Sequence, residues 1–125
     1  MTEFFFDSHA LWQYVALAAV VVALVFSFQA EMTPTAERVY RLTGVVVGIQ
    51  VLLGLILWFL SSGWGLGFMQ GWLHPLIGIA AVGVINVFTA RARRAGAETG
   101  NSVFRTGIII AVVLVVAAIG IGEMA

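Results

Sequence analysis

Four long apolar stretches, joined by three short connections, constrain this chain more than any other feature. The stretches cover residues 10–28, 42–60, 73–88 and 104–121, and each is apolar around most of its circumference. About 20 apolar residues in a helix cross a hydrocarbon core of about 30 Å. None of the stretches alternates with the period of two that membrane-spanning strands need. The sequence therefore predicts an all-α membrane protein, a single four-transmembrane-helix bundle over residues 1–125.

The composition agrees with a membrane protein and excludes cysteine-based chemistry. Hydrophobic residues make up 62% of the chain and charged residues 10%, which excludes an ordinary soluble domain. The chain has no cysteine, so it has no disulfide, no thiolate metal site and no nucleophilic thiol. The first apolar stretch follows the acidic residues Glu3 and Asp7, and we expect no cleaved signal peptide. No nucleic-acid partner is expected.

All of the positive charge comes from six arginines, and they lie on alternate connections: Arg38, Arg41, Arg91, Arg93, Arg94 and Arg105. The N-terminus, residues 61–72 and the C-terminal Glu123 form the other side, which has no Lys or Arg. Short connections make consecutive helices antiparallel, and arginine-rich loops stay in the cytoplasm. We therefore expect an up-down bundle in the plasma or inner membrane, with both termini extracytoplasmic. The connection 91–101 should contact anionic lipid headgroups.

Polar side chains inside the apolar stretches are few, and such residues are costly enough to indicate function. His9 and His74 lie at the starts of the first and third stretches. Gln13 follows His9 by about one helical turn and shares its face. Gln50 lies in the middle of the second stretch, where either an interhelical hydrogen bond or a ligand-facing role fits. Asn86, near the cytoplasmic end of the third stretch, fits a capping or snorkelling role.

Glycines mark places where another backbone or a flat ligand can come close. Gly71 and Gly78 flank His74 by about one turn on either side, and Gly44 and Gly48 form a small-xxx-small pair on the second stretch. Contact between helices is the ordinary use of such residues. A rigid planar ligand beside His74 is the alternative that these positions leave open.

The topology places both imidazoles on the same side of the membrane, because the first and third helices both begin outside. A neutral imidazole nitrogen is a good ligand for haem iron, and a four-helix bundle can hold the macrocycle between two helices. Two imidazoles do not make a structural zinc site, which needs four ligands. We expect His9 and His74 to bind one haem b, with its propionates near the outer surface. The competing interpretation is that each histidine only marks a helix start.

Residues 8–94 resemble one half of the haem A synthase family, a four-helix half-domain that occurs twice in full-length members. The matching features are His9, a Gln-x-x-x-Gly motif at Gln50 and Gly54, and His74, in the family order, with 41 and 24 residues between successive polar positions. The resemblance implies that the two histidines are axial haem ligands on the outer side. The other residues expected to shape the pocket are Gln13, Gln50, Gly54, Gly71 and Gly78.

The chain departs from the family at two points. The family's catalytic half has a Glu three residues before its first histidine, where this chain has Phe6. The outer-loop cysteine pair of many members is missing, and a single bis-His site leaves no open coordination position for oxygen. The resemblance therefore implies haem binding for electron transfer or haem handling, and it gives no expectation of enzymatic haem hydroxylation. Two halves per full-length member also imply a homodimer or a larger membrane complex.

Three other functions were weighed against haem binding. The chain could be a cofactor-free accessory subunit of a respiratory or photosynthetic complex, whose tryptophan-rich outer surface and glycine faces pack on partners. A transporter or channel is disfavoured, because no charged residue lies in the centre of any stretch. A quinone site near Gln13 and His9 stays open, although no spacing singles it out.

Overall fold

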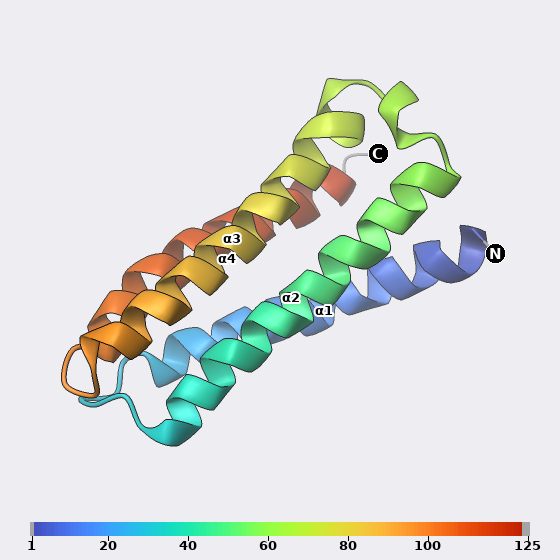
Figure 1. Cartoon of the computed structure of the whole chain (residues 1–125). Helices are drawn as coiled ribbons and strands as arrows, with labels where there is room; N and C mark the ends of the chain where they lie inside the picture. Colours follow the sequence, from blue (N-terminus) through green and yellow to red (C-terminus); the bar gives the residue numbers. More distant parts are fainter. Residues whose placement is uncertain (1, 124–125) are drawn as a thin grey trace.

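The computed structural model describes residues 2–123, which form an all-α bundle of four long helices (Figure 1). The helices are α1 (Thr2–Phe26), α2 (Pro34–Leu60), α3 (His74–Ala95) and α4 (Gly100–Glu123). A short 3-10 turn, η1 (Gly63–Gly65), and a π-helical segment, η2 (Phe68–Leu73), connect α2 to α3. Consecutive helices are antiparallel, and each packs on two neighbours. The predicted all-α fold and four-helix bundle are confirmed.

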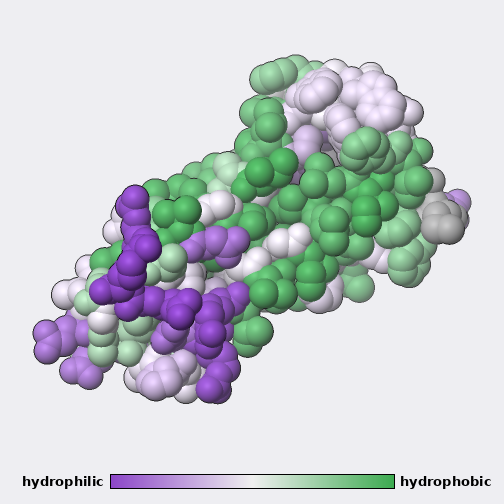
Figure 2. All heavy atoms as spheres, viewed as in Figure 1, coloured by the Kyte–Doolittle hydropathy of each residue, from purple (hydrophilic) through white to green (hydrophobic). Residues whose placement is uncertain are grey.

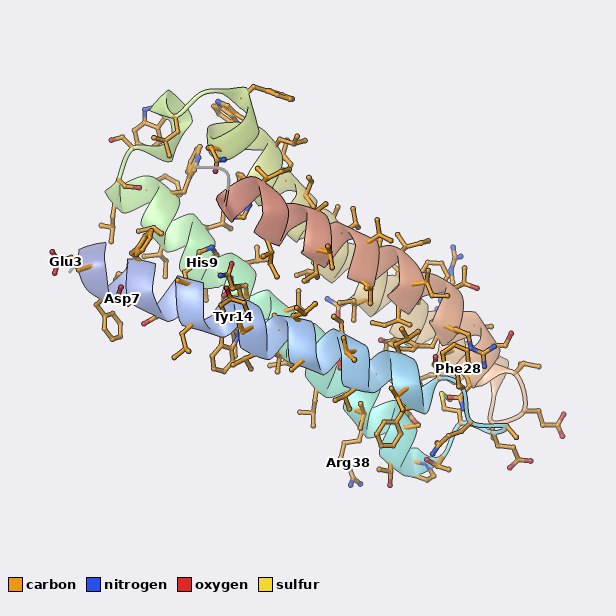
Figure 3. All side chains as sticks on the ribbon, turned by 180° about the vertical axis from the view of Figure 1, so that it is seen from behind. Glu3, Asp7, His9, Tyr14, Phe28 and Arg38 are labelled. Atoms are coloured by element: carbon orange, nitrogen blue, oxygen red, sulfur yellow. The ribbon has the colours of Figure 1, made fainter. Side chains whose placement is uncertain are left out.

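The bundle has two different ends. The start of α1, residues 61–73 and the end of α4 lie together at one end, which we call the histidine end (Figure 1). The connections 27–33 and 96–99 lie at the other, the arginine end, where hydrophilic residues gather (Figure 2). Figure 3 shows Glu3 and Asp7 near the histidine end and Arg38 near the opposite end.

All four helices are long and apolar enough to cross a membrane. The candidate spans are Glu3–Phe26, Pro34–Leu60, Gln70–Ala95 and Gly100–Gly122. Most of the surface between the two ends is hydrophobic in Figure 2, as lipid contact requires. These features support a multi-pass membrane protein.

The helix ends differ from the limits of the apolar stretches. Helix α2 begins at Pro34, eight residues before the stretch 42–60, because Thr33 caps it: the Thr33 hydroxyl accepts from the Ala36 N–H at 3.1 Å. Proline at the first helical position needs no hydrogen-bond acceptor. Hydropathy identifies only the part of a helix that suits hydrocarbon; the sequence indicates a capped turn here with Thr35 as the cap, whereas the cap is Thr33.

Aromatic stacking and hydrogen bonds close the arginine end. The rings of Tyr40 and Phe104 stack with their centroids 3.7 Å apart, and both side chains are fully buried. The Tyr40 hydroxyl donates to the Asn101 side-chain oxygen. The Asn101 amide nitrogen donates in turn to the carbonyls of Gln29 and Glu31, each at 2.9 Å. This buried network ties α2, α4 and the connection 27–33 together.

The interior is closely packed at the arginine end of the bundle and contains a cavity at the histidine end. The largest fully buried apolar side chains are Val20, Tyr40, Ile85, Phe104 and Ile108, and they fill the middle and the arginine end. Toward the histidine end, alanine and glycine take the inward positions. Because such small residues cannot fill the space between four helices, a cavity forms there.

Candidate functional site

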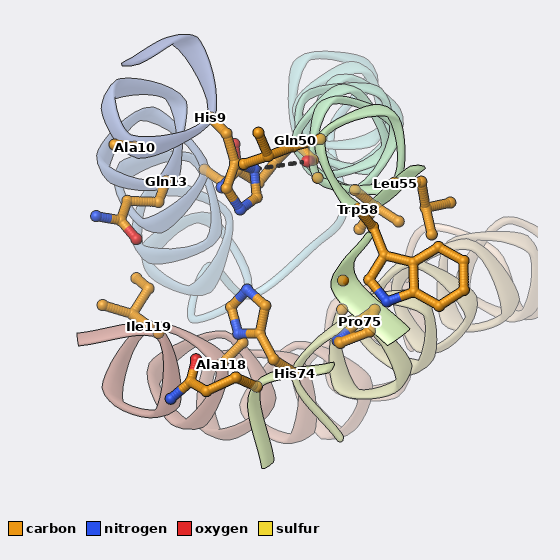
Figure 4. Close-up of a pocket in the computed structure, with 18 of the residues that line it drawn as sticks. His9, Ala10, Gln13, Gln50, Leu55, Trp58, His74, Pro75, Ala118 and Ile119 are labelled. Atoms are coloured by element: carbon orange, nitrogen blue, oxygen red, sulfur yellow. Dashed lines mark hydrogen bonds between the residues drawn. The ribbon is translucent and has the colours of Figure 1, made fainter. Parts of the chain in front are cut away.

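The cavity at the histidine end has a volume of about 480 Å³ (Figure 4). Ligand pockets in proteins commonly measure about 300–1,000 Å³. Every long helix contributes small residues to its wall, namely Ala10, Gly54, Gly78, Ala81, Ala118 and Gly122. The cavity can therefore hold a ligand of considerable size between the four helices.

His9 and His74 face one another across this cavity (Figure 4). Their ring centroids are 6.1 Å apart, and the ring planes are nearly perpendicular, at 89°. His9 belongs to α1 and His74 to α3, and each of these helices packs mainly on α2 and α4. The two imidazoles thus reach the middle of the bundle from diagonally opposite helices.

A backbone contact orients the His9 ring. Its Nδ1 lies 3.2 Å from the carbonyl oxygen of Gln50. A carbonyl can only accept, so Nδ1 carries the proton and Nε2 keeps its lone pair for a ligand. The Gln50 side chain lines the cavity but does not make this contact, and its Oε1 is buried without a hydrogen-bond partner in the described part of the chain. The sequence predicts either an interhelical hydrogen bond or a ligand-facing role for the Gln50 side chain. The contact with His9 comes instead from the Gln50 backbone carbonyl.

Each histidine ring packs against a glycine on the neighbouring helix. A Cβ built on Gly54 of α2 would lie 2.8 Å from Cε1 of His9, which is too close for a carbon contact. A Cβ on Gly122 of α4 would lie 3.3 Å from Cε1 of His74. Gly54 belongs to the predicted Gln-x-x-x-Gly motif. Gly122 was not foreseen, because the family resemblance does not reach the fourth helix.

The remaining predicted pocket residues separate into two groups. Gln13 and Gly78 line the cavity, and Gly78 also lets α3 approach Val51 of α2, where a Cβ would be 3.3 Å from the valine Cγ2. Gly71 has a different role in the segment above the cavity. Its carbonyl accepts from the Trp58 indole at 2.7 Å, which fixes η2 over the end of α2.

Several residues that line the cavity were not among the predicted pocket residues. Gln70 of η2 lines the cavity, and its amide nitrogen donates to the Ile121 carbonyl, which links η2 to α4. Phe6 also lines the cavity. Trp58 lines it too and makes edge contacts with Trp64 and Trp72, at centroid distances of 5.2 and 5.5 Å.

Not every tryptophan serves in an interfacial belt. The indole N–H of Trp12 donates to the Val46 carbonyl of α2 at 2.8 Å, inside the bundle. Trp64 and Trp72 are each nearly half exposed at the histidine end, as a belt would require.

The ring separation fits two ligands of one metal atom. A metal–nitrogen bond is about 2 Å long and a ring centre lies about 1 Å beyond the nitrogen, so two opposed imidazoles have centroids about 6 Å apart. The observed distance is 6.1 Å. Residues 2–123 hold no group of three or more His, Cys, Asp or Glu side chains that could complete a metal site. Within the described residues, His9 and His74 are therefore the pair of side chains that could hold a metal atom in this cavity.

Comparison with known protein families, curated proteins and solved structures finds no match for the chain. The chemistry of the site therefore rests on its own residues and their geometry.

Proposed function

We propose that the chain is a b-type haem protein of the membrane, in which His9 and His74 are the axial ligands of one haem per chain. The observation that supports this most directly is the pair of imidazoles facing one another at 6.1 Å across an apolar cavity. Neutral imidazole nitrogens are common axial ligands of haem iron. The resemblance to one half of a haem A synthase is part of the same proposal.

The surrounding residues have defined roles in this proposal. The Gln50 carbonyl orients His9, as the second hydrogen bond of a metal-bound histidine commonly does. The small residues around the cavity leave room for a planar macrocycle, and Gln13 and Gln50 border it. Bound haem would supply one-electron redox chemistry. Because no cationic side chain lines the described part of the cavity, the carboxylates of a bound haem would need water as their partner.

Electron transfer or haem handling suits this site better than oxygenation. Among the described residues that line the cavity, the two histidines are the only ionisable side chains, so none is left to give or take a proton once both hold the iron. Phe6 occupies the place that resembles the family's glutamate. The positive-inside rule puts the histidine end on the outer side of the plasma or inner membrane. The proposal includes assembly of the protein as a homodimer or within a larger membrane complex.

An absorption spectrum tests the proposal. Purified protein supplied with haem b should give a sharp reduced-minus-oxidised Soret and α-band spectrum typical of two nitrogen ligands. His9→Ala and His74→Ala should each lose this six-coordinate spectrum while keeping wild-type helicity by circular dichroism. Gly48→Ala, which has no atom within 4 Å of the new methyl, is the control and should bind like wild type.

A wild-type protein that folds and takes up no haem would contradict the proposal. If it then co-purified at fixed stoichiometry with other membrane subunits, the accessory-subunit function would replace it.

A further inference from the structure

The two imidazoles are held unequally, and the inference drawn from this difference rests on the proposed function. His9 Nδ1 donates to the Gln50 carbonyl, whereas His74 Nδ1 is buried without a hydrogen-bond partner in the described part of the chain. A ligating imidazole usually donates its second N–H to an oxygen, which fixes the ring and raises its basicity. Losing such a partner commonly costs about 10–100-fold in metal affinity. His9 has this support and His74 lacks it.

The backbone and the packing around His9 also differ from those around His74. His9 lies within the regular helix α1, whereas His74 is the first residue of α3 and follows the π-helical segment Phe68–Leu73. Pro75, the next residue, has no N–H to donate. The glycine beside His74 is also less crowded: a Cβ on Gly122 would lie 3.3 Å from the ring, against 2.8 Å for Gly54 and His9. His9 therefore has a regular helix around it and the closer glycine contact of the two.

The wall on the His74 side defines what could enter. Pro75 and Ala118 lie beside His74 in Figure 4, and Gln70, which also lines the cavity, donates its amide N–H to the Ile121 carbonyl. No cationic side chain lines the described part of the cavity. A buried anion without a partner is costly, and ferrous iron in a porphyrin carries no net charge that could offset one, so a ligand of the reduced haem should be neutral.

We propose that His74 is the exchangeable axial ligand, and that its side of the cavity admits a small neutral ligand of the carbon monoxide or imidazole class. The exchange breaks one coordinate bond from nitrogen to iron and forms one from the lone pair of the entering ligand. No electron or proton is transferred. The chain would thus bind haem through His9 and respond to a second ligand at the position of His74.

Carbon monoxide binding to the reduced, haem-loaded protein tests this inference. In wild type the observed rate should level off at high carbon monoxide concentration, because His74 must leave first. In His74→Ala the rate should rise linearly with concentration, and added imidazole should restore the six-coordinate spectrum. The haem dissociation constant should rise at least tenfold more in His9→Ala than in His74→Ala.

A matched pair of variants keeps both histidines and protects the test against misfolding. Gly122→Ala places a methyl on the His74 ring and should change the plateau rate by more than about threefold, because contacts at this distance force the ring to shift. Gly120→Ala, on the same helix, faces open space and should leave the rate unchanged. An unaltered plateau in Gly122→Ala would overturn the inference.

The failures of the two proposals are distinguishable. Wild type that binds no haem removes the proposed function itself. Wild type that binds haem and no carbon monoxide, or a plateau that persists in His74→Ala, leaves haem binding intact and shows that His74 is not the exchangeable ligand.

Discussion

Gly54 and Gly122 determine where the two imidazoles can lie. His9 on α1 packs against a glycine of α2, and His74 on α3 packs against a glycine of α4. In both cases the helix that carries the histidine and the helix that carries the glycine are consecutive in the chain. The same contact between a histidine ring and a glycine therefore occurs twice, once in each helical hairpin. A side chain at either glycine would take space that a ring now fills.

We predict that Gly54→Ala displaces His9. The new methyl would lie 2.8 Å from Cε1, so the ring must move and its hydrogen bond to the Gln50 carbonyl is lost. Haem affinity should fall about 10–100-fold, and overpacking should cost about 1–3 kcal/mol of stability. Haem titration and thermal unfolding in detergent measure these effects. Gly48→Ala on the same helix is the control, and equal effects in the two variants would refute the role of Gly54.

We predict a smaller effect for Gly122→Ala on equilibrium binding. The contact there is 3.3 Å, so the His74 ring must shift by only a few tenths of an ångström. Haem affinity should fall by less than about tenfold, since the hydrogen bond from His9 to the Gln50 carbonyl is untouched. The same haem titration checks this, with Gly120→Ala as the reference. A larger loss than in Gly54→Ala would reverse the assigned order of the two ligands.

The sequence predicts part of this site, and the missing parts have physical causes. His9 and His74 could be assigned to one end, because helix order and short connections determine it. The contact from Gln50 could not be assigned, since every residue has a carbonyl and the sequence gives no sign of which one is used. Gly122 depends on how α4 is rotated about its axis against α3, which side-chain packing decides.

At the scale of helices, each end of the bundle is bridged by a different diagonal pair. Tyr40 of α2 stacks on Phe104 of α4 at the arginine end, and His9 of α1 faces His74 of α3 at the histidine end. The first pair is fully buried and in direct contact, whereas the second pair borders a cavity. The arginine end therefore joins α2 and α4 by direct side-chain contact, without a ligand.

Removing the Tyr40 hydroxyl should test this difference. Tyr40→Phe keeps the stacked ring but leaves the buried Asn101 side-chain oxygen without its donor. We expect a loss of about 1–3 kcal/mol in the free energy of unfolding, measured by thermal unfolding in detergent, with haem affinity unchanged. Tyr14→Phe removes a hydroxyl from a side chain that is 57% exposed, and it should change stability by less than about 0.5 kcal/mol. Equal losses would show that the network contributes little.

The sequence predicts the membrane-spanning part of each helix but not where each helix begins and ends. Apolar length identifies all four, because hydrocarbon requires it. The π-helical segment Phe68–Leu73 was not predicted, since it depends on tertiary contacts such as the hydrogen bond from Gln70 to the Ile121 carbonyl. The position of Trp12 shows the same limit: depth in the membrane is readable, and the direction of a side chain is not.

The separation of charge concerns the whole molecule and predicts its orientation. The chain has no cysteine, so a single introduced thiol can be followed. Ser61 is exposed at the histidine end and Glu98 is exposed at the arginine end. In intact cells, a membrane-impermeant maleimide should label Ser61→Cys at once and Glu98→Cys only after the membrane is permeabilised. The opposite labelling pattern would place the histidine end in the cytoplasm.

The position of the tryptophans has a practical consequence. Trp58 borders the cavity and is in ring contact with Trp64 and Trp72, so three of the chain's four indoles lie together at the site. Haem absorbs light at the wavelengths where indole fluoresces, and energy transfer over such short distances is efficient. Haem bound in the cavity should therefore quench the tryptophan fluorescence, so the fluorescence intensity reports how much of the protein is loaded without an added dye.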